Sequence, residues 1–297
     1  MERGRLDRPS GDTVCNELFT IRNRTVQCDA GDYRMSFPYY FELFGQRVHP
    51  HPVFEVLAYL LGSRLYFYQR KRTTLPQPSF EHSIWLLTAC LTGALIGAKL
   101  LAFLESPVDF WQHRYEAAAW AGGKTIVGGM LGAWLGVELA KKKLQVTVST
   151  GDLYVLPLLI SISIGRMGCF LTGLSDHTYG LPTNLPTGVD FGDGIRRHPT
   201  QLYEIAFLVL LGITLFALRR KLPRDGTLFR LFVASYLGFR FLIEFFKPRF
   251  EYALGLSAIQ IASFCGCAFA IRLLLRGQAN AVHSSRDILI AQPRAEN

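Results

Sequence analysis

Seven long apolar stretches, separated by short charged segments, dominate this chain of 297 residues. Each is about 18–25 residues long, which is the length that an α-helix needs to cross the hydrocarbon core of a bilayer. Because backbone polar groups find no water in lipid, these stretches are expected to be helices. They cover approximately residues 52–69, 83–104, 124–140, 148–172, 201–219, 227–246 and 256–275. The sequence therefore predicts an all-α polytopic membrane protein with about seven transmembrane helices.

The composition supports a membrane location. Only 19% of the residues are charged and 49% are hydrophobic, whereas soluble globular chains carry about 25% charged residues. This composition excludes a disordered chain, a fibre and a small disulfide-stapled secreted fold. The net charge of +9 would suggest nucleic-acid binding in a soluble protein. Here the basic residues lie at the ends of the apolar stretches, as the positive-inside rule expects, so we predict no nucleic-acid partner.

Basic residues are unequally divided between the two sets of loops that join the predicted helices. One set, with the start of the C-terminal tail, holds twelve: Arg70, Lys71, Arg72, Lys141, Lys142, Lys143, Arg219, Arg220, Lys221, Arg224, Arg272 and Arg276. The opposite set, with the end of the N-terminal segment, holds seven: Arg47, Arg114, Lys124, Arg196, Arg197, Lys247 and Arg249. Because the richer side is cytoplasmic, we expect the N-terminus outside, the C-terminus inside and the loop 173–200 facing outward.

Three regions follow from this pattern. We expect residues 1–50 to form an extracytoplasmic arm or cap, residues 51–276 the transmembrane domain, and residues 277–297 a disordered cytoplasmic tail. The arm contains no apolar run typical of a signal peptide, so cleavage is not expected. Cys15 and Cys28 lie in the arm, where a disulfide and two free thiols both fit the sequence. No cysteine or histidine group has metal-site spacing, so no metal and no cofactor are predicted.

Charged residues inside the apolar stretches are the strongest functional signal, because a charge at membrane depth costs about 2.5–3.5 kcal/mol and usually faces an interior cavity. The candidates are Glu55, Arg64, Lys99, Arg166, Glu204, Arg240 and Glu244. For Arg64 and Lys99 two interpretations stay open: each faces an interior cavity, or its long side chain reaches the membrane surface from a helix end. Arg166 lies between Gly165 and Gly168 in an apolar run, and these glycines would allow a backbone or a lipid head group to approach.

Arg240 and Glu244 are four residues apart on one predicted helix and therefore share a face. Two interpretations stay open. The residues form an ion pair that neutralises two buried charges, or Glu244 orients Arg240 toward an anion. A guanidinium group offers a planar fork of donors that matches the oxygens of a phosphate.

A polar run at 196–204, RRHPTQLYE, precedes the fifth predicted helix on the outer side. It contains Arg197, His198, Gln201 and Glu204. Outward basic residues run against the positive-inside rule, which favours a task such as holding a lipid phosphate; an ordinary interfacial anchor is the alternative. We expect the basic side chains to converge near the outer leaflet, where a phospholipid is the natural anionic ligand: Arg166, Arg196, Arg197, His198 and Arg240.

Glycines at four-residue spacing mark two further helix faces. Gly93 and Gly97 form one set, and Gly128, Gly132 and Gly136 form the other. Such sets allow helix backbones to approach closely in a membrane. Close packing is the expected role of these glycines.

Three motifs of this chain resemble those of the prolipoprotein diacylglyceryl transferase family in order and spacing. They are GRMGCF at 165–170, RHPTQLYE at 197–204 and RFLIEFF at 240–246. The resemblance covers roughly residues 37–275. It implies a multi-pass enzyme of the bacterial inner membrane that transfers a diacylglyceryl group from phosphatidylglycerol to the lipobox cysteine of a prolipoprotein, with release of glycerol phosphate. Phosphatidylglycerol and the prolipoprotein signal peptide are the implied partners, and the oligomeric state stays open.

The resemblance also implies roles for single residues. Arg166 would bind the phospholipid head group, Arg240 would stabilise the leaving phosphate, and Glu244 would support Arg240. The full set of implied residues is Arg240, Glu244 and His198 for catalysis, and Arg166, Arg197, Gln201, Glu204, Gly128 and Gly129 for substrate binding. A water-poor site with arginine donors acts where the phosphate charge develops.

The sequence departs from the family pattern at several positions. The His of the family's His-Gly-Gly is Val127 here, the Asn of its G-R-x-G-N-F is Cys169, and a following Glu is Leu174. The missing His removes the expected base for the acceptor thiol, which reacts as a thiolate. His177, His198 and Glu55 are candidate replacements, and catalysis without a base is a further possibility. A divergent relative with another acceptor, or a lipid-binding protein without activity, is the alternative function.

Overall fold

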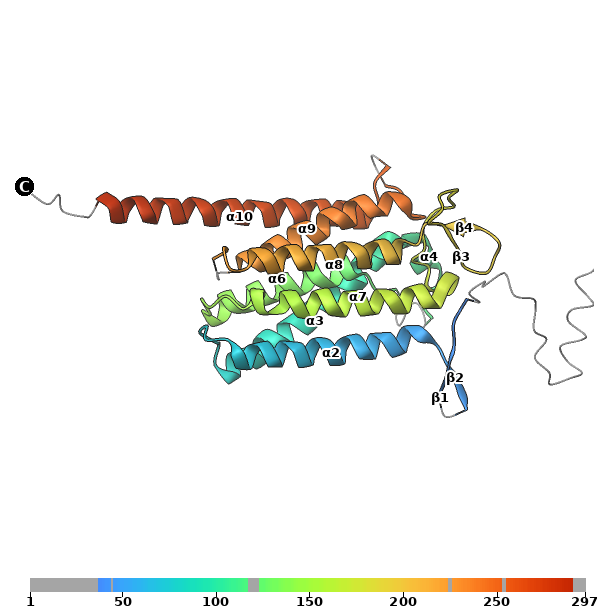
Figure 1. Ribbon diagram of the computed structural model, residues 1–297, viewed down its shortest axis with the longest axis horizontal. Helices are drawn as coiled ribbons and strands as arrows, with labels where there is room; N and C mark the ends of the chain where they lie inside the picture. The colour runs from blue at the N-terminus through green and yellow to red at the C-terminus, as the bar shows by residue number, and fades with distance from the viewer. Residues whose placement is uncertain (1–36, 44, 117–122, 224–225, 253–254, 291–297) are drawn as a thin grey trace, which may run out of the picture. The chain divides into compact units, whose positions relative to one another are not determined.

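The computed structural model of the protein describes residues 37–43, 45–116, 123–223, 226–252 and 255–290 (Figure 1). These residues are mostly helical. Most of the expected arm, residues 1–50, and both of its cysteines lie outside the described residues. The described end of the arm forms a short antiparallel hairpin of β1, Phe41–Leu43, and β2, Gln46–Val48.

Each of the seven predicted stretches is a long helix in the structure, and Figure 1 shows these helices lying roughly along one direction. They are α2 (Pro50–Arg72), α3 (Phe80–Glu105), α6 (Ile126–Leu144), α7 (Val155–Thr172), α8 (Thr200–Leu218), α9 (Thr227–Ile243) and α10 (Ala258–Ile290). Shorter elements join them: α4 (Pro107–Gln112), η1 (Gly151–Tyr154), η2 (Gly173–Asp176), η3 (Glu244–Phe246), β3 (Val189–Asp190) and β4 (Arg196–Arg197). The prediction of a helical chain is confirmed.

Four segments among the described residues are long and apolar enough to cross a membrane. They are Phe80–Glu105, Gly151–Asp176, Thr200–Leu218 and Ala258–Arg276. Helices α2 and α6 end in the basic runs 70–72 and 141–143, and α9 has only 17 residues, so these three are less clearly spanning. The number of seven crossings and the orientation of the termini stay predictions.

The outer surfaces of the helices expose large apolar side chains. Leu91, Leu210 and Phe264 are 61%, 64% and 62% exposed. A soluble protein rarely leaves such residues in large contiguous patches, whereas lipid solvates them. This surface supports a multi-pass membrane protein.

Helices α3 and α6 pack through the two glycine sets, as the spacing predicts. A Cβ atom on Gly132 would lie 2.1 Å from the carbonyl oxygen of Gly93, and one on Gly97 would lie 2.2 Å from that of Gly128. No side chain fits at such distances, so the backbones touch. Small residues therefore create this interface.

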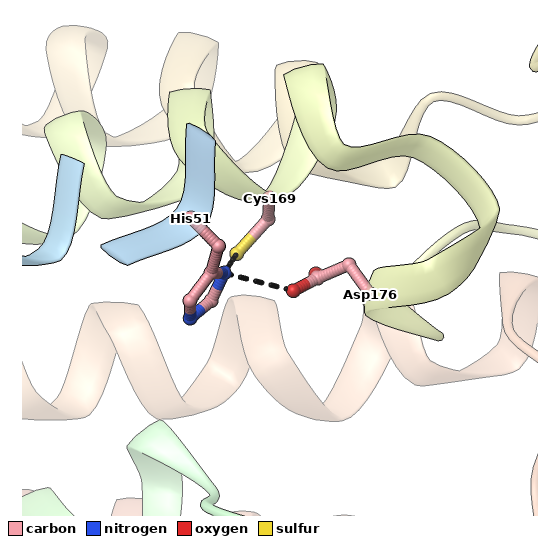
Figure 2. A group of neighbouring side chains, drawn as sticks. All are labelled: His51, Cys169 and Asp176. Carbon is pink, nitrogen blue, oxygen red and sulfur yellow. Dashed lines mark hydrogen bonds and ion pairs between the residues drawn. The ribbon is translucent and has the colours of Figure 1, made fainter. Parts of the chain in front are cut away.

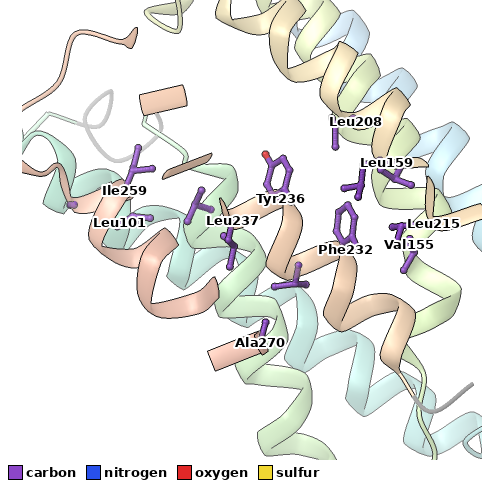
Figure 3. Close-up of a cluster of buried hydrophobic side chains, with 14 residues drawn as sticks. Leu101, Val155, Leu159, Leu208, Leu215, Phe232, Tyr236, Leu237, Ile259 and Ala270 are labelled. Carbon is purple, nitrogen blue, oxygen red and sulfur yellow. The ribbon is translucent and has the colours of Figure 1, made fainter. Parts of the chain in front are cut away.

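The buried apolar core surrounds one face of α9 (Figure 3). Phe232, Val233, Tyr236 and Leu237 of α9 have no exposed surface. Side chains from α6, α7, α8 and α10 cover them, for example Leu208 of α8. Since this face continues for one turn to Arg240, the core leads directly to the buried charges described below.

Helix α10 extends past the apolar span into the segment that was predicted as the C-terminal tail. It runs to Ile290, so residues 277–290 are helical, and residues 291–297 lie outside the described residues. No proline occurs between 258 and 290, and Ala, Leu and Arg, which are frequent there, favour helix. The division of the chain into arm, transmembrane domain and tail stays a prediction.

Candidate functional site

Two buried arginines from different helices meet on one glutamate. Arg166 of α7, Arg240 of α9 and Glu204 of α8 are 5%, 4% and 1% exposed. Oε2 of Glu204 lies 2.8 Å from Nε of Arg166 and 3.0 Å from Nη1 of Arg240. The structure thus brings together the fourth, fifth and sixth predicted helices at the charges that the sequence singled out.

Tyr236 contacts Glu204, and Glu244 contacts Arg240. The hydroxyl of Tyr236 donates a hydrogen bond of 2.7 Å to Oε1 of Glu204. Nη2 of Arg240 donates one of 3.1 Å to Oε2 of Glu244, at the end of α9. Arg166, Glu204, Arg240 and Glu244 are called the arginine–glutamate cluster below. Buried charges persist when they are paired in this way, so the fold tolerates two guanidinium groups in its interior.

The cluster keeps unused hydrogen-bond donors. The Nε–H groups of Arg166 and Arg240 are buried and have no acceptor among the described residues. Nε of Arg166 is close to Glu204, but its N–H is not directed at the carboxylate. A buried donor without an acceptor is costly, and phosphate oxygens are acceptors that match a guanidinium fork. The cluster therefore has the donors that an anionic ligand needs.

The glycines beside Arg166 differ in their surroundings. A Cβ atom on Gly165 would meet nothing within 4 Å, whereas one on Gly168 would lie 2.6 Å from Cβ of Phe54 on α2. The helix surface at Gly165 is thus open, as expected for approach of a ligand. Gly168 instead allows α2 to pack closely against α7.

Lys247 is a buried cation beside the cluster that the sequence analysis counted only as a loop residue. It follows η3, and its backbone N–H donates to the carbonyl oxygen of Glu244. Burial, together with the positive charges of Arg240 and Arg166, lowers the pKa of Lys247 to about 7. A sequence signal existed: the lysine comes three residues after Glu244 and directly follows the last motif, 240–246.

Lys247→Met is expected to change how the stability of the protein depends on pH. The unfolded lysine has a pKa of about 10.4 and the folded one about 7, so the unfolded state binds more protons between these values. The stability contributed by Lys247 therefore rises from about pH 7 to pH 10 and is lowest below pH 7. Thermal unfolding in detergent should show the variant stabilised relative to the wild type near pH 6, with the difference shrinking toward pH 9.

The exposed Lys221, which follows the C-terminal end of α8, provides the control. Lys221→Met should leave the pH dependence of the unfolding temperature unchanged. A difference between wild type and Lys247→Met that is constant with pH would show that this amine does not titrate in the range.

The basic residues of the loop do not all join the cluster, contrary to our expectation. Nη1 of Arg197 lies 2.6 Å from Oδ1 of Asp193, and its guanidinium group lies over the ring of Tyr179. This pairing lowers the pKa of the Asp193 carboxyl. Arg196 donates to the carbonyl oxygens of Gly188 and Pro186. The antiparallel pairing of β3 with β4 directs these polar contacts into the loop itself.

His198 and Gln201 lie where the loop meets α8. Nδ1 of His198 lies 3.3 Å from the hydroxyl of Tyr203, and its ring contacts that of Phe246. Nε2 of Gln201 donates to the hydroxyl of Thr178, while its buried Oε1 has no partner among the described residues. Gln201 is one turn before Glu204, so it is the better placed of the two to extend the cluster.

Gly128 and Gly129, which follow Val127, lie where α6 packs against α3. Gly128 faces α3, and a Cβ atom on Gly129 would lie 3.6 Å from Cβ of Ala98. Val127 itself has no exposed surface and belongs to the apolar core. The substrate-binding role implied for Gly128 and Gly129 stays a prediction, and no polar group occupies position 127.

A second polar group, which sequence analysis missed, joins α2, α7 and η2 (Figure 2). Nδ1 of His51 lies 2.9 Å from Oδ1 of Asp176 and 3.8 Å from Sγ of Cys169. Nη1 of Arg166 lies 3.8 Å from the same sulfur, so this group adjoins the arginine–glutamate cluster. Cys169 was noted only as a departure from a motif, and His51 was not noted. His51 and Cys169 are 118 residues apart in the sequence, so no spacing pattern indicates their contact.

Comparison with known proteins gives a consistent result. The family model described as prolipoprotein diacylglyceryl transferase matches residues 38–276. The phosphatidylglycerol–prolipoprotein diacylglyceryl transferase of Geobacter sulfurreducens is 31% identical over 269 residues, which cover 85% of this chain and 98% of that protein. The proteins of the same name from Nitrosomonas europaea and Clostridium tetani are 31% and 30% identical, over 69% and 71% of this chain and 77% and 85% of their own lengths.

Proposed function

The chain belongs to the prolipoprotein diacylglyceryl transferase family, and from this premise we propose that it transfers a diacylglyceryl group from phosphatidylglycerol to a prolipoprotein. The acceptor is the lipobox cysteine thiol, and glycerol phosphate is released. The observation that carries the proposal is the meeting of Arg166 and Arg240 on Glu204, with buried donors left for a phosphate.

The cluster supplies electrostatic stabilisation to the reaction. The acceptor thiol loses its proton, its sulfur forms a bond to the glyceryl carbon, and the bond from that carbon to the phosphate oxygen breaks. The electron pair and the negative charge leave with glycerol phosphate. Arg166 and Arg240 donate to the phosphate as this charge develops. Glu204, which accepts a hydrogen bond from Tyr236, fixes the two guanidinium groups, and Glu244 orients Arg240 from the other side.

The acceptor brings the nucleophile, so the enzyme needs no nucleophile of its own. A cysteine of the enzyme would form a thioether with the diacylglyceryl group, and a thioether does not pass its carbon on to a second thiol. Among the candidate bases, Glu55 pairs with Lys124 at 3.6 Å and accepts from Tyr59, and His198 contacts Tyr203. Within the described part of the chain, neither Glu55 nor His198 forms a hydrogen bond or an ion pair with the cluster.

The topology that goes with this function has seven crossings in the bacterial inner membrane, with the N-terminus outside and the C-terminus inside. Basic runs end α2 and α6. Figure 1 shows the hairpins β1–β2 and β3–β4 at the opposite end of the helices from the C-terminal end of α10. The cluster residues lie at the β3–β4 end of α7, α8 and α9. This supports an active site that opens toward the outer leaflet.

A second candidate is lipid binding without transfer, and the observation that favours it is the apolar, buried Val127 at the position of the family's histidine. Expression in bacterial cells depleted of their own transferase separates the two candidates. We expect growth and lipoprotein modification to be restored. Absence of rescue, with the protein present in the membrane, would support the binding protein and contradict the enzyme.

A further inference from the structure

His51, Cys169 and Asp176 form a three-sided set of ligand atoms beside Arg166 of the arginine–glutamate cluster (Figure 2). Nδ1 of His51, Sγ of Cys169 and a carboxylate oxygen of Asp176 all lie within 4.8 Å of one another. Cys169 is buried and the Asp176 side chain is only 8% exposed, whereas the His51 side chain is 41% exposed. One side of the set is therefore open and the others are enclosed.

The local structure holds these side chains in place. The absence of a side chain at Gly168 lets α2 approach α7, since a Cβ atom there would lie 2.6 Å from Cβ of Phe54, three residues after His51. Gly173, with a φ of 69°, turns the chain from α7 into η2 and returns Asp176 to the end of α7. The hydroxyl of Thr178 donates to the Asp176 carboxylate. The start of α2 and the turn from α7 into η2, more than 100 residues apart in the sequence, are thus fixed at one point.

The geometry distinguishes a metal site from a proton relay. In a relay of cysteine, histidine and aspartate, the thiol and the carboxylate contact different ring nitrogens. Here both approach Nδ1 of His51, and Figure 2 shows the other ring nitrogen directed away from them. Sulfur, nitrogen and oxygen atoms that lie this close together form a ligand set that could hold a cation.

The ligand types and distances suit zinc. Zinc binds Cys, His and Asp at about 2.0–2.3 Å, so tetrahedral ligand atoms are about 3.3–3.6 Å apart. The two separations from Nδ1 of His51, 2.9 Å and 3.8 Å, require shifts of a few tenths of an ångström, and Sγ of Cys169 lies within 4.8 Å of the Asp176 carboxylate. The thiolate and the carboxylate would neutralise the two charges of the ion. Three protein ligands with an open fourth position are typical of catalytic zinc sites.

We propose that His51, Cys169 and Asp176 bind a zinc ion whose fourth coordination position receives the acceptor thiol. A thiol bound to zinc is deprotonated at neutral pH, and the proton passes to water on the exposed side of His51. Nη1 of Arg166 is 3.8 Å from Sγ of Cys169, so the zinc-bound thiolate forms beside the phosphate that Arg166 holds. The sulfur–carbon bond then forms and the carbon–oxygen bond to phosphate breaks, with no change in the oxidation state of the metal.

Activation of the acceptor thiol by the bound zinc rests on the proposed function, whereas zinc binding itself does not. It supplies the thiol activation for which position 127 offers no base. The inference departs from the sequence prediction of no metal, because positions 51, 169 and 176 form no spacing motif.

Zinc content of the full-length protein, purified in detergent through a tag that binds no metal, tests the site. We expect about one zinc per chain in the wild type and below about 0.1 in Cys169→Ala and His51→Ala. Cys90→Ala, at a partly buried cysteine of α3, is the control and should keep its zinc. Size-exclusion chromatography checks that each variant is folded.

Cobalt(II) provides a second readout on the wild-type protein. Cobalt added after removal of zinc should give visible bands and a sulfur-to-metal charge-transfer band, and this band should be missing in Cys169→Ser. Absence of zinc and of the cobalt spectrum in the wild type would overturn the site, as would equal zinc in wild type and Cys169→Ala.

Transfer to a lipobox peptide separates this inference from the proposed function. We expect removal of zinc to lower the rate at least about 10-fold and zinc to restore it. Full activity of the zinc-free protein would overturn thiol activation and leave the transferase function intact. A zinc-loaded protein that never transfers lipid would contradict the transferase and leave the metal site intact.

Discussion

Arg166→Ala is expected to lower the rate of diacylglyceryl transfer at least about 100-fold, because it removes a donor that acts on the developing phosphate charge in a water-poor site. Arg166 is enclosed, and its guanidinium group shares Glu204 with Arg240. Arg166→Lys keeps the charge but loses the planar fork, so it should recover only part of the rate. Transfer is measured as mass gain of a lipobox peptide in detergent with phosphatidylglycerol.

The control for this loss is Arg272→Ala, at an exposed arginine near the middle of α10. It should leave the rate within about twofold of the wild type, since an exposed charge that lies away from the site contributes little. Transfer by Arg166→Ala at the wild-type rate would show that the phosphate binds elsewhere.

Glu204→Gln is expected to have the largest effect on stability. The substitution preserves shape but removes the carboxylate that Arg166 and Arg240 share, which leaves two buried guanidinium groups with Glu244 as the only acidic member of the cluster. Loss of one partner from a buried ion pair costs about 3–5 kcal/mol. Thermal unfolding in detergent should therefore show a marked decrease in unfolding temperature, and the transfer activity of the folded fraction should decrease as well.

Glu251→Gln is the matched control. Glu251 pairs with Arg249 at 3.2 Å, but its side chain is 55% exposed, so the change in stability should stay below about 1 kcal/mol. An unfolding temperature of Glu204→Gln equal to that of Glu251→Gln would mean that the cluster is not buried in the membrane-embedded protein.

The helices and the central charges were predictable because each depends on local sequence. Apolar runs of sufficient length predict helices in lipid, and a four-residue spacing places Arg240 and Glu244 on one helix face. Arg166 was identified because a charge in an apolar run requires a partner. What the sequence lacked was the identity of that partner. Glu204 lies near a helix start, where a glutamate is common, and only the packing of α7, α8 and α9 shows that it joins both arginines.

The contacts of the loop 173–200 and of the His51 group were less predictable, because they too depend on how distant segments pack. Arg196 and Arg197 were expected at the cluster because of their charge, but the β3–β4 pairing and Asp193 engage them locally. His51 meets Cys169 only because α2 packs against α7 at Gly168. Contacts between segments more than 100 residues apart leave no spacing pattern that could be recognised in a single sequence.

Binding of phosphatidylglycerol tests most directly whether the arginine–glutamate cluster holds a lipid phosphate. Native mass spectrometry of the purified wild type should show retained phosphatidylglycerol, while the double variant Arg166→Ala/Arg240→Ala should lose it and Arg272→Ala should keep it. Equal retention of phosphatidylglycerol by the wild type and the folded double variant would contradict this account.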